Sequence, residues 1–155
     1  STSIFAENIY IDGTVESRCS IFTDTSGFWG NPSAFKLSTL PADGGRVPVI
    51  RYDVSLASAY RAEISTPISF SSSPTLSDST VFTGAITVTQ TSSSDMSGYQ
   101  AASTTPASNT RAYALTVAGS TWFSASSLAL YGGGNQTPFP SGSYKGIVLA
   151  TCVPM

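Results

Sequence analysis

Apolar and polar residues alternate with period two along most of the chain, beginning near its N-terminus. Most odd positions of the first 21 residues are apolar, namely Phe5, Ile9, Ile11, Val15, Cys19 and Ile21. This alternation is typical of an antiparallel strand that buries one face. Asp12–Gly13 is a possible hairpin turn, but the parity continues across it, so the pattern predicts one long first strand.

The same rhythm predicts further strands at 47–56, 60–70, 81–90, 111–117, 128–131 and 144–153. Their expected inward residues include Ile50, Tyr52, Val54, Tyr60, Ala62, Ile64, Ile68, Phe70, Phe82, Ile86, Val88, Tyr113 and Leu115. Residues 91–110 are predicted to form a long polar loop. About seven strands joined by loops rich in Gly, Pro and Ser predict an all-β fold, a sandwich of immunoglobulin-like type. Residues 1–155 are expected to form one such domain.

The last predicted strand is apolar on both faces. Tyr144, Val148 and Cys152 alternate there with Ile147, Leu149 and Val153. A continuous apolar run suits a strand in the middle of a sandwich, where both faces are covered. The sequence therefore predicts that this strand is covered on both sides, in part by a strand from outside the domain.

The composition supports a β protein and argues against several partners. The chain has 28 Ser and 19 Thr but only 10% charged residues, unlike helical proteins, whose surfaces are rich in Glu and Lys. A net charge of −2 gives no basic surface for nucleic acid or for anionic lipid. No apolar run approaches the ~20 residues of a membrane-spanning helix, so membrane insertion is not expected.

The inventory of reactive side chains argues against catalysis. Histidine is absent, which removes the commonest general base and the imidazole ligands of most zinc sites. The nine carboxylates are scattered and form no calcium-loop motif. We therefore expect no enzyme, no cofactor and no metal. A secreted hydrolase that uses a pair of carboxylates stays a minor alternative, because such pairing is spatial.

Two cysteines, Cys19 and Cys152, lie near the two ends of the chain. They are either free thiols of a cytosolic domain or one disulfide of a secreted domain. The composition, rich in Ser and Thr, favours the second alternative.

One loop has an unusual sequence, Gly-Phe-Trp-Gly-Asn-Pro at 27–32. Phe28 and Trp29 are candidates for a platform on which a sugar stacks, with Asn31 as its hydrogen-bond partner. Alternatively, Trp29 caps one end of the sandwich. A free-standing, secreted glycan-binding module is therefore one hypothesis for the function.

Both ends of the chain resemble bacterial chaperone-usher pilus subunits. The segment ENIYIDGTVESRCSI resembles their first strand, and PSGSYKGIVLATC resembles their last strand. The segments YRAEISTPISFSSSP and VFTGAITVTQ fit the middle strands in order and spacing. Matched in this way, the resemblance covers most of the chain.

The resemblance implies a structural or adhesive fimbrial subunit, secreted through the periplasm to the cell surface. Such subunits lack the final strand of their sandwich, and the open groove takes a strand first from an assembly chaperone and then from the next subunit. The resemblance makes Tyr144, Ile147, Val148 and Leu149 the groove-bordering residues. It makes Phe5, Ile9 and Ile11 the donor side chains. Other pilus subunits, a periplasmic chaperone and a host receptor or glycan are the implied partners.

Two features depart from ordinary pilus subunits. Only a short donor segment at 1–7 is expected before the first strand, and Cys19 has no partner other than Cys152. Because the two cysteines lie on terminal strands that neighbour each other in this fold class, we predict a Cys19–Cys152 disulfide. The Cys-Val-Pro ending is similar to that of Afa/Dra-type invasin subunits, which occupy fimbrial tips and receive a strand without donating one.

Overall fold

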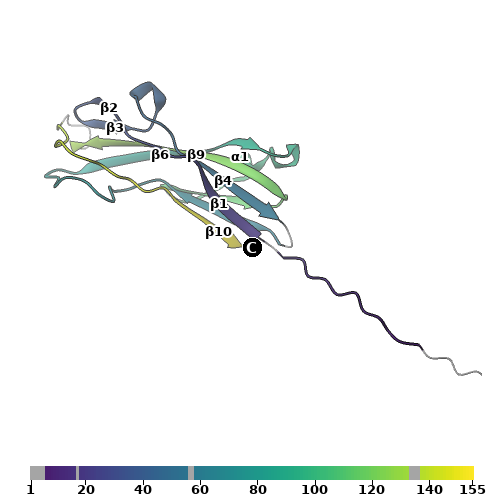
Figure 1. The fold of residues 1–155 in the computed structure, drawn as a ribbon. Helices are drawn as coiled ribbons and strands as arrows, with labels where there is room; N and C mark the ends of the chain where they lie inside the picture. Colours follow the sequence, from purple (N-terminus) through teal and green to yellow (C-terminus); the bar gives the residue numbers. More distant parts are fainter. Residues whose placement is uncertain (1–5, 17, 56–57, 133–136) are drawn as a thin grey trace, which may run out of the picture.

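The protein is an all-β sandwich of two antiparallel sheets, as predicted (Figure 1). The structure, a computed structural model, describes residues 6–16, 18–55, 58–132 and 137–155. In the first sheet, β1 (Arg18–Thr25), β4 (Val49–Ser55), β9 (Gly119–Tyr131), β3 (Lys36–Ser38) and β2 (Gly30–Ser33) follow one another, and β6 (Thr80–Thr91) pairs along β9. The second sheet has the order β10 (Leu149–Pro154), β5 (Tyr60–Ser65), β8 (Thr110–Leu115) and β7 (Thr104–Ala107). A 3-10 turn, η1 (Pro41–Asp43), links β3 to β4.

These ten strands exceed the expected seven because the loops of the sandwich contain the short strands β2, β3 and β7. The predicted strand at 128–131 is the end of the 13-residue β9, which begins at Gly119. Every second residue of β9 from Thr121 to Tyr131 is buried, so one face of this central strand lies in the core and the other is only partly covered.

The core lies between the sheets and follows the predicted parity over most of its length. Its buried residues include Ile50, Tyr52, Val54, Tyr60, Ala62, Ile64, Ile86, Tyr113, Leu115 and Phe123. The Phe123 ring packs against Tyr52 and Tyr113, with centroid distances of 5.4 and 4.6 Å. The prediction that Ile68 shares the inward face is wrong, because β5 ends at Ser65 and Ile68 lies in the following turn, 70% exposed.

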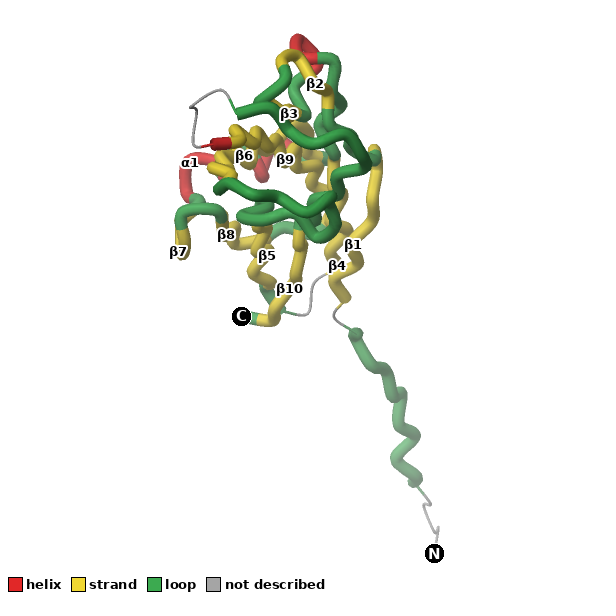
Figure 2. Tube along the Cα trace, turned by 90° about the vertical axis from the view of Figure 1, so that its left-hand side faces the viewer, coloured by secondary structure: helices red, strands yellow, loops and turns green. Residues whose placement is uncertain are grey.

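The prediction of one strand running from the N-terminal segment into Cys19 is also wrong. β1 begins at Arg18, and residues 6–16 form an extension with no regular secondary structure. Ile9 and Ile11 are 89% and 99% exposed. Figures 1 and 2 show the extension leaving the sandwich at the end where β10 finishes. Its alternating pattern is that of a strand, but no described strand lies beside it. Phe5 lies outside the described residues.

The last strand is shorter than predicted and lies at a sheet edge rather than in the middle. β10 starts at Leu149, and among the described strands it pairs with β5 alone. Val148, Ala150 and Cys152 pack against the core, whereas Leu149 and Val153 face outward and are exposed. The apolar outer face therefore does not mark a central strand.

The predicted polar loop at 91–110 is structured and covers part of the core. It contains the 3-10 turn η2 (Ser94–Met96), the short helix α1 (Tyr99–Ala102) and β7. Met96 and Tyr99 are buried, and the Tyr99 hydroxyl accepts hydrogen bonds from the amides of Thr116 and Val117. Among the described residues, no helix is long and apolar enough to span a membrane.

Gln100 in α1 occupies the free edge of β6 in the way a neighbouring strand would. Its Oε1 accepts the Val88 amide at 2.9 Å, and its Nε2 lies 3.5 Å from the Ile86 carbonyl oxygen. The Tyr113 hydroxyl lies within hydrogen-bond distance of both Gln100 Oε1 and Ile86 O. One side chain thus satisfies a donor and an acceptor of an otherwise open strand edge.

We expect Gln100→Glu to destabilise the fold by about 1–2 kcal/mol at pH 7. The carboxylate can still accept from Val88, but it cannot donate to Ile86 and brings a charge next to that carbonyl. Protonation of the new carboxylate at low pH restores a donor to Ile86, so the loss in free energy of unfolding should become smaller as the pH falls towards 4. Urea unfolding at pH 7 and at pH 4 measures the free energy of unfolding of the variant and of the parent. Gln90→Glu, the same change at an exposed position of β6, is the control and should unfold like the parent at both. An equal loss of unfolding free energy in the two variants would contradict the role of Gln100 at the edge of β6.

Candidate functional site

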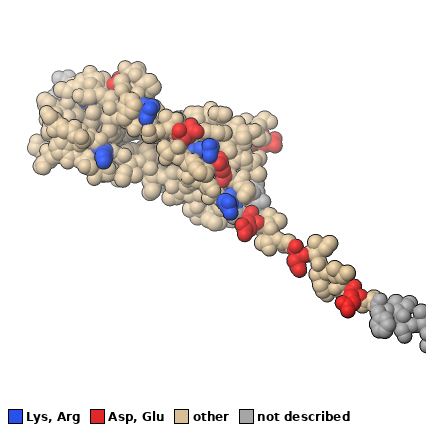
Figure 3. Space-filling view, viewed as in Figure 1, with Lys and Arg blue, Asp and Glu red and all other residues tan. Residues whose placement is uncertain are grey.

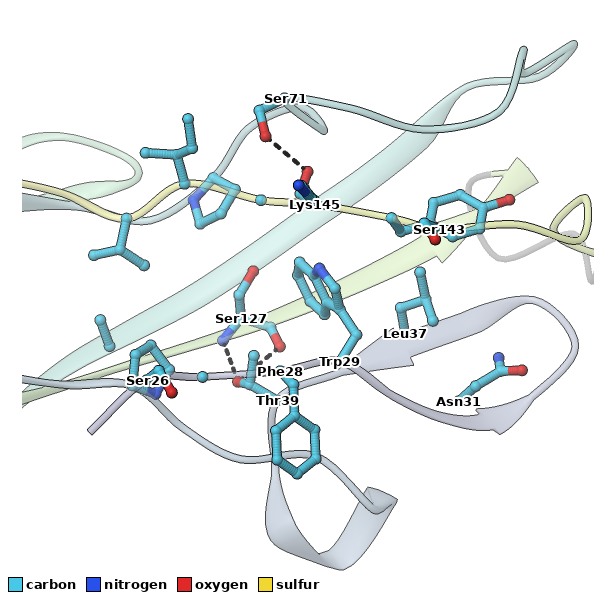
Figure 4. Close-up of a pocket in the computed structure, with 18 of the residues that line it drawn as sticks. Ser26, Phe28, Trp29, Asn31, Leu37, Thr39, Ser71, Ser127, Ser143 and Lys145 are labelled. Atoms are coloured by element: carbon cyan, nitrogen blue, oxygen red, sulfur yellow. Dashed lines mark hydrogen bonds between the residues drawn. The ribbon is translucent and has the colours of Figure 1, made fainter. Parts of the chain in front are cut away.

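An open groove of about 1180 Å³ separates the two sheets along one side of the sandwich. One wall is formed by β1 and the loop that follows it, from Ile21 to Asn31, and the other by the segment from Phe139 to Ala150. Leu37, Ile50, Ala125 and Ser127 lie at its floor. Figure 4 shows the two walls facing each other, with Ser127 and Trp29 between them. The groove lies between the edge strands β1 and β10 of the two sheets.

The groove exists because the middle of β9 carries small residues on its inward face. Two large rings, Phe123 and Tyr131, flank a run of three small inward residues, Ala125, Ser127 and Ala129. Small side chains leave unfilled space beneath the opposite wall, and protein cores rarely keep such space empty. The groove therefore lacks the apolar side chains that a well-packed sandwich would have.

The groove walls are apolar and offer free backbone edges. Ile21, on the inward face of β1, remains 37% exposed because no described residue covers it on the groove side. β1 pairs with β4 only and β10 with β5 only among the described strands. The site thus combines exposed apolar side chains with unpaired amide and carbonyl groups, a combination that promotes strand addition.

The groove is closed at one end by covalent and hydrogen bonds between its walls. The predicted disulfide is confirmed: Cys19 of β1 is bonded to Cys152 of β10, with their Cα atoms 6.5 Å apart. One residue away, the hydroxyl of Tyr52 donates to the Thr151 carbonyl at 2.9 Å. Burial raises the pKa of Tyr52, so this phenol stays protonated at physiological pH. The two sheets are therefore held together at this end.

An aromatic cluster holds the far part of the C-terminal wall. The Phe70 ring packs edge-on against Phe82, Phe139 and Tyr144, and Phe139 also stacks on Tyr131 at 4.9 Å. The backbone of Lys145 pairs with that of Ser72. This wall is thus fixed in place although residues 144–148 form no continuous strand.

The structure brings three of the four predicted groove residues to the groove. Tyr144, Ile147 and Val148 line it. Leu149 instead points to the outer side of β10, beside a shallow hollow that includes Ile68. Ile9 and Ile11, the predicted donor residues within the described chain, lie in the extension and not in this groove.

The predicted sugar platform is not assembled as one surface. The amide nitrogen of Asn31 donates to the carbonyls of Ser33 and Lys36 within the β2–β3 hairpin. The Arg46 guanidinium covers Phe28 at 4.9 Å, and Trp29 packs edge-on against Phe70 at 6.0 Å. Phe28 and Trp29 thus have different neighbours, and Asn31 stabilises its own hairpin.

Sequence reasoning missed the floor of the groove. Ala125 and Ser127 have no chemical signature by themselves. The sequence does carry one signal for the floor, which is the run of small residues at alternate positions between Phe123 and Tyr131. This signal is visible only when the bounds of β9 are known.

Comparison with protein-family models, with curated proteins and with solved structures finds no match to this chain. The function must therefore be argued from the groove and the extension themselves.

Proposed function

We propose that this chain is a subunit of a bacterial surface fimbria that assembles by donor-strand complementation. One observation carries the proposal: the chain has an apolar groove between two unpaired strand edges and, outside the sandwich, an exposed extension with a strand-like apolar pattern. The extension of one subunit fills the groove of the next.

The two surfaces complement each other chemically. Ile9, Ile11 and Val15 would all lie on one face of an extended segment, and that face would enter the groove. Burying each of these side chains contributes on the order of 1.5–3 kcal/mol, and the backbone of the extension supplies hydrogen bonds to β1 and β10. The same contacts cannot form while both surfaces are exposed to water, so an isolated subunit is prone to association.

The charges of the extension and the groove wall are also complementary. The described extension carries Glu7, Asp12 and Glu16 and no basic residue (Figure 3). Lys145 lies on the C-terminal wall of the groove. Opposite charges on the two surfaces speed their encounter and disfavour binding of basic segments.

The position of the extension favours a subunit that both receives and donates a strand. A tip subunit of the invasin type only receives one, whereas here at least residues 6–16 lie outside the sandwich and are free to insert elsewhere. The partners are then further fimbrial subunits, with an assembly chaperone occupying the groove beforehand in the periplasm. The Cys19–Cys152 disulfide suits that oxidising compartment.

The test is the self-association of the full chain and of two extension variants. Wild-type chain should form oligomers whose size increases with concentration in sedimentation velocity experiments. Ile11→Asp places a charge on the inserted face and should leave the chain monomeric, because a carboxylate buried without a partner costs several kcal/mol. Tyr10→Asp, the neighbouring position on the opposite face, is the matched control and should assemble.

Two results would contradict the proposal. A wild-type chain that stays monomeric and fails to bind a synthetic peptide of residues 6–16 has no strand-accepting groove. Equal assembly of the Ile11→Asp variant and the parent would show that the extension is not the donor.

A further inference from the structure

Ser127 at the floor of the groove has a buried hydroxyl without a hydrogen-bond partner. The residue is 3% exposed, and its Oγ makes no hydrogen bond. Its backbone is satisfied, since the amide donates to Thr39 Oγ1 at 2.8 Å and the carbonyl accepts from the same hydroxyl at 3.2 Å. Figure 4 shows the Ser127 side chain pointing away from Thr39, toward the opposite wall. A buried hydroxyl left unpaired costs about 1–3 kcal/mol, so its retention calls for a partner.

The indole of Trp29 points into the same groove and partly fills it (Figure 4). It reaches across to the opposite wall at Gly146, where an added Cβ would lie 3.0 Å from Trp29 Cζ2. Its N–H group has no hydrogen-bond acceptor among the described residues. The groove therefore presents two donors without an acceptor among the described residues, the hydroxyl of Ser127 on its floor and the indole N–H of Trp29 on its wall.

The apolar face of the extension has one matching irregularity. The positions that enter the groove are Ile9, Ile11, position 13 and Val15, and position 13 is glycine. An inserted strand has no side chain there, so its backbone can approach the floor more closely than at any other inward position. Backbone carbonyls are acceptors, which is what two free donors require.

We propose that Ser127 and Trp29 form a hydrogen-bonding site that sets the register of the inserted strand by holding the backbone carbonyls next to Gly13 of a second copy. The inference rests on the proposed function and adds the residues that choose one alignment. A shift by two residues would place Ile11 or Val15 against Trp29 and leave both donors unpaired. Such a shift keeps the apolar face inward, so apolar burial alone would not exclude it.

The test uses the full chain carrying Ile11→Asp as receptor, which disables its own extension, and a synthetic peptide of residues 6–16 as ligand. Isothermal titration gives the affinity. Ser127→Ala and Trp29→Phe in the receptor should each weaken binding about fivefold, the effect of losing one hydrogen bond. A peptide with Gly13→Ala should bind at least about tenfold more weakly to the parent receptor, because the added methyl group overpacks the site.

The controls separate binding from folding. Ser127→Ala removes an unpaired buried hydroxyl, so its melting temperature should equal or exceed that of the parent receptor. Ser126→Ala changes the next residue, whose Oγ lies 3.3 Å from the Ala85 carbonyl on the other face of β9, and should leave peptide affinity unchanged. A Thr14→Ala peptide, altered on the outward face, should also bind normally. In nitrogen–proton spectra, the indole signal of Trp29 should move downfield when the peptide binds, and that of Trp122 should not.

The outcomes distinguish the two proposals. No binding of the parent peptide would overturn the proposed function and this inference with it. Binding of the parent peptide that Ser127→Ala, Trp29→Phe and Gly13→Ala all leave unchanged would overturn the register site alone.

Discussion

Ile64→Asp should leave the chain unfolded at 25 °C in the absence of any partner. Ile64 is fully buried in β5, in the core between the sheets. The substitution removes the burial of one isoleucine and places a carboxylate without a partner in the core. Together these effects cost about 5 kcal/mol or more, which equals the whole stability of many domains of this size.

Circular dichroism and urea unfolding measure this effect, and Ile68→Asp is the matched control. The sequence pattern gives both isoleucines the same parity, but Ile68 is largely exposed in the turn after β5. Its substitution should change the free energy of unfolding by less than about 0.5 kcal/mol. Equal unfolding of the two variants would contradict the assigned end of β5 and the core derived from it.

Loss of the Cys19–Cys152 disulfide should lower the free energy of unfolding by about 2–5 kcal/mol. The bond joins residues 133 positions apart, so it restricts nearly the whole unfolded chain. In the chain-entropy model a loop of this length gives an effect near the upper limit. The bond also holds the edge strands of two different sheets, which among the described residues share no backbone ladder.

Urea unfolding of the oxidised chain, of the reduced chain and of the double variant Cys19→Ala/Cys152→Ala measures this loss. The reduced chain and the double variant should unfold at similar, lower urea concentrations. Coincident curves for the oxidised and reduced chains would show that the bond adds nothing to stability.

The sequence predicted the sandwich and most of its core because strand periodicity reports burial directly. β4, β5 and β8 have one face in the core, and the parity of Ile50, Ile64 and Tyr113 was enough to orient them. The disulfide followed from two cysteines on terminal strands.

Periodicity was misleading where an alternating segment has no partner among the residues that the structure describes. The pattern at 6–16 is that of a strand, yet it shows only which face the segment would bury, not where that face is buried. The apolar outer face of β10 misled the prediction for the same reason, since Leu149 and Val153 suggest cover that the described residues do not provide. The groove floor was not predicted because it depends on which residues of β9 lie on its inward face, and the sequence did not give the bounds of that strand.

The closed end of the groove has a mechanical consequence. The extension leaves the sandwich next to Arg18, at the same end where Cys19 is bonded to Cys152 (Figure 2). In a fibre built as proposed, tension enters a subunit through the strand lying between β1 and β10 and leaves through its own extension. Force on β10 then passes through the Cys19–Cys152 disulfide to the start of β1, where the extension leaves the sandwich. Force on β1 passes to the same point along the backbone of that strand. The load bypasses the core, so such a fibre would bear tension without unfolding the sandwiches that compose it.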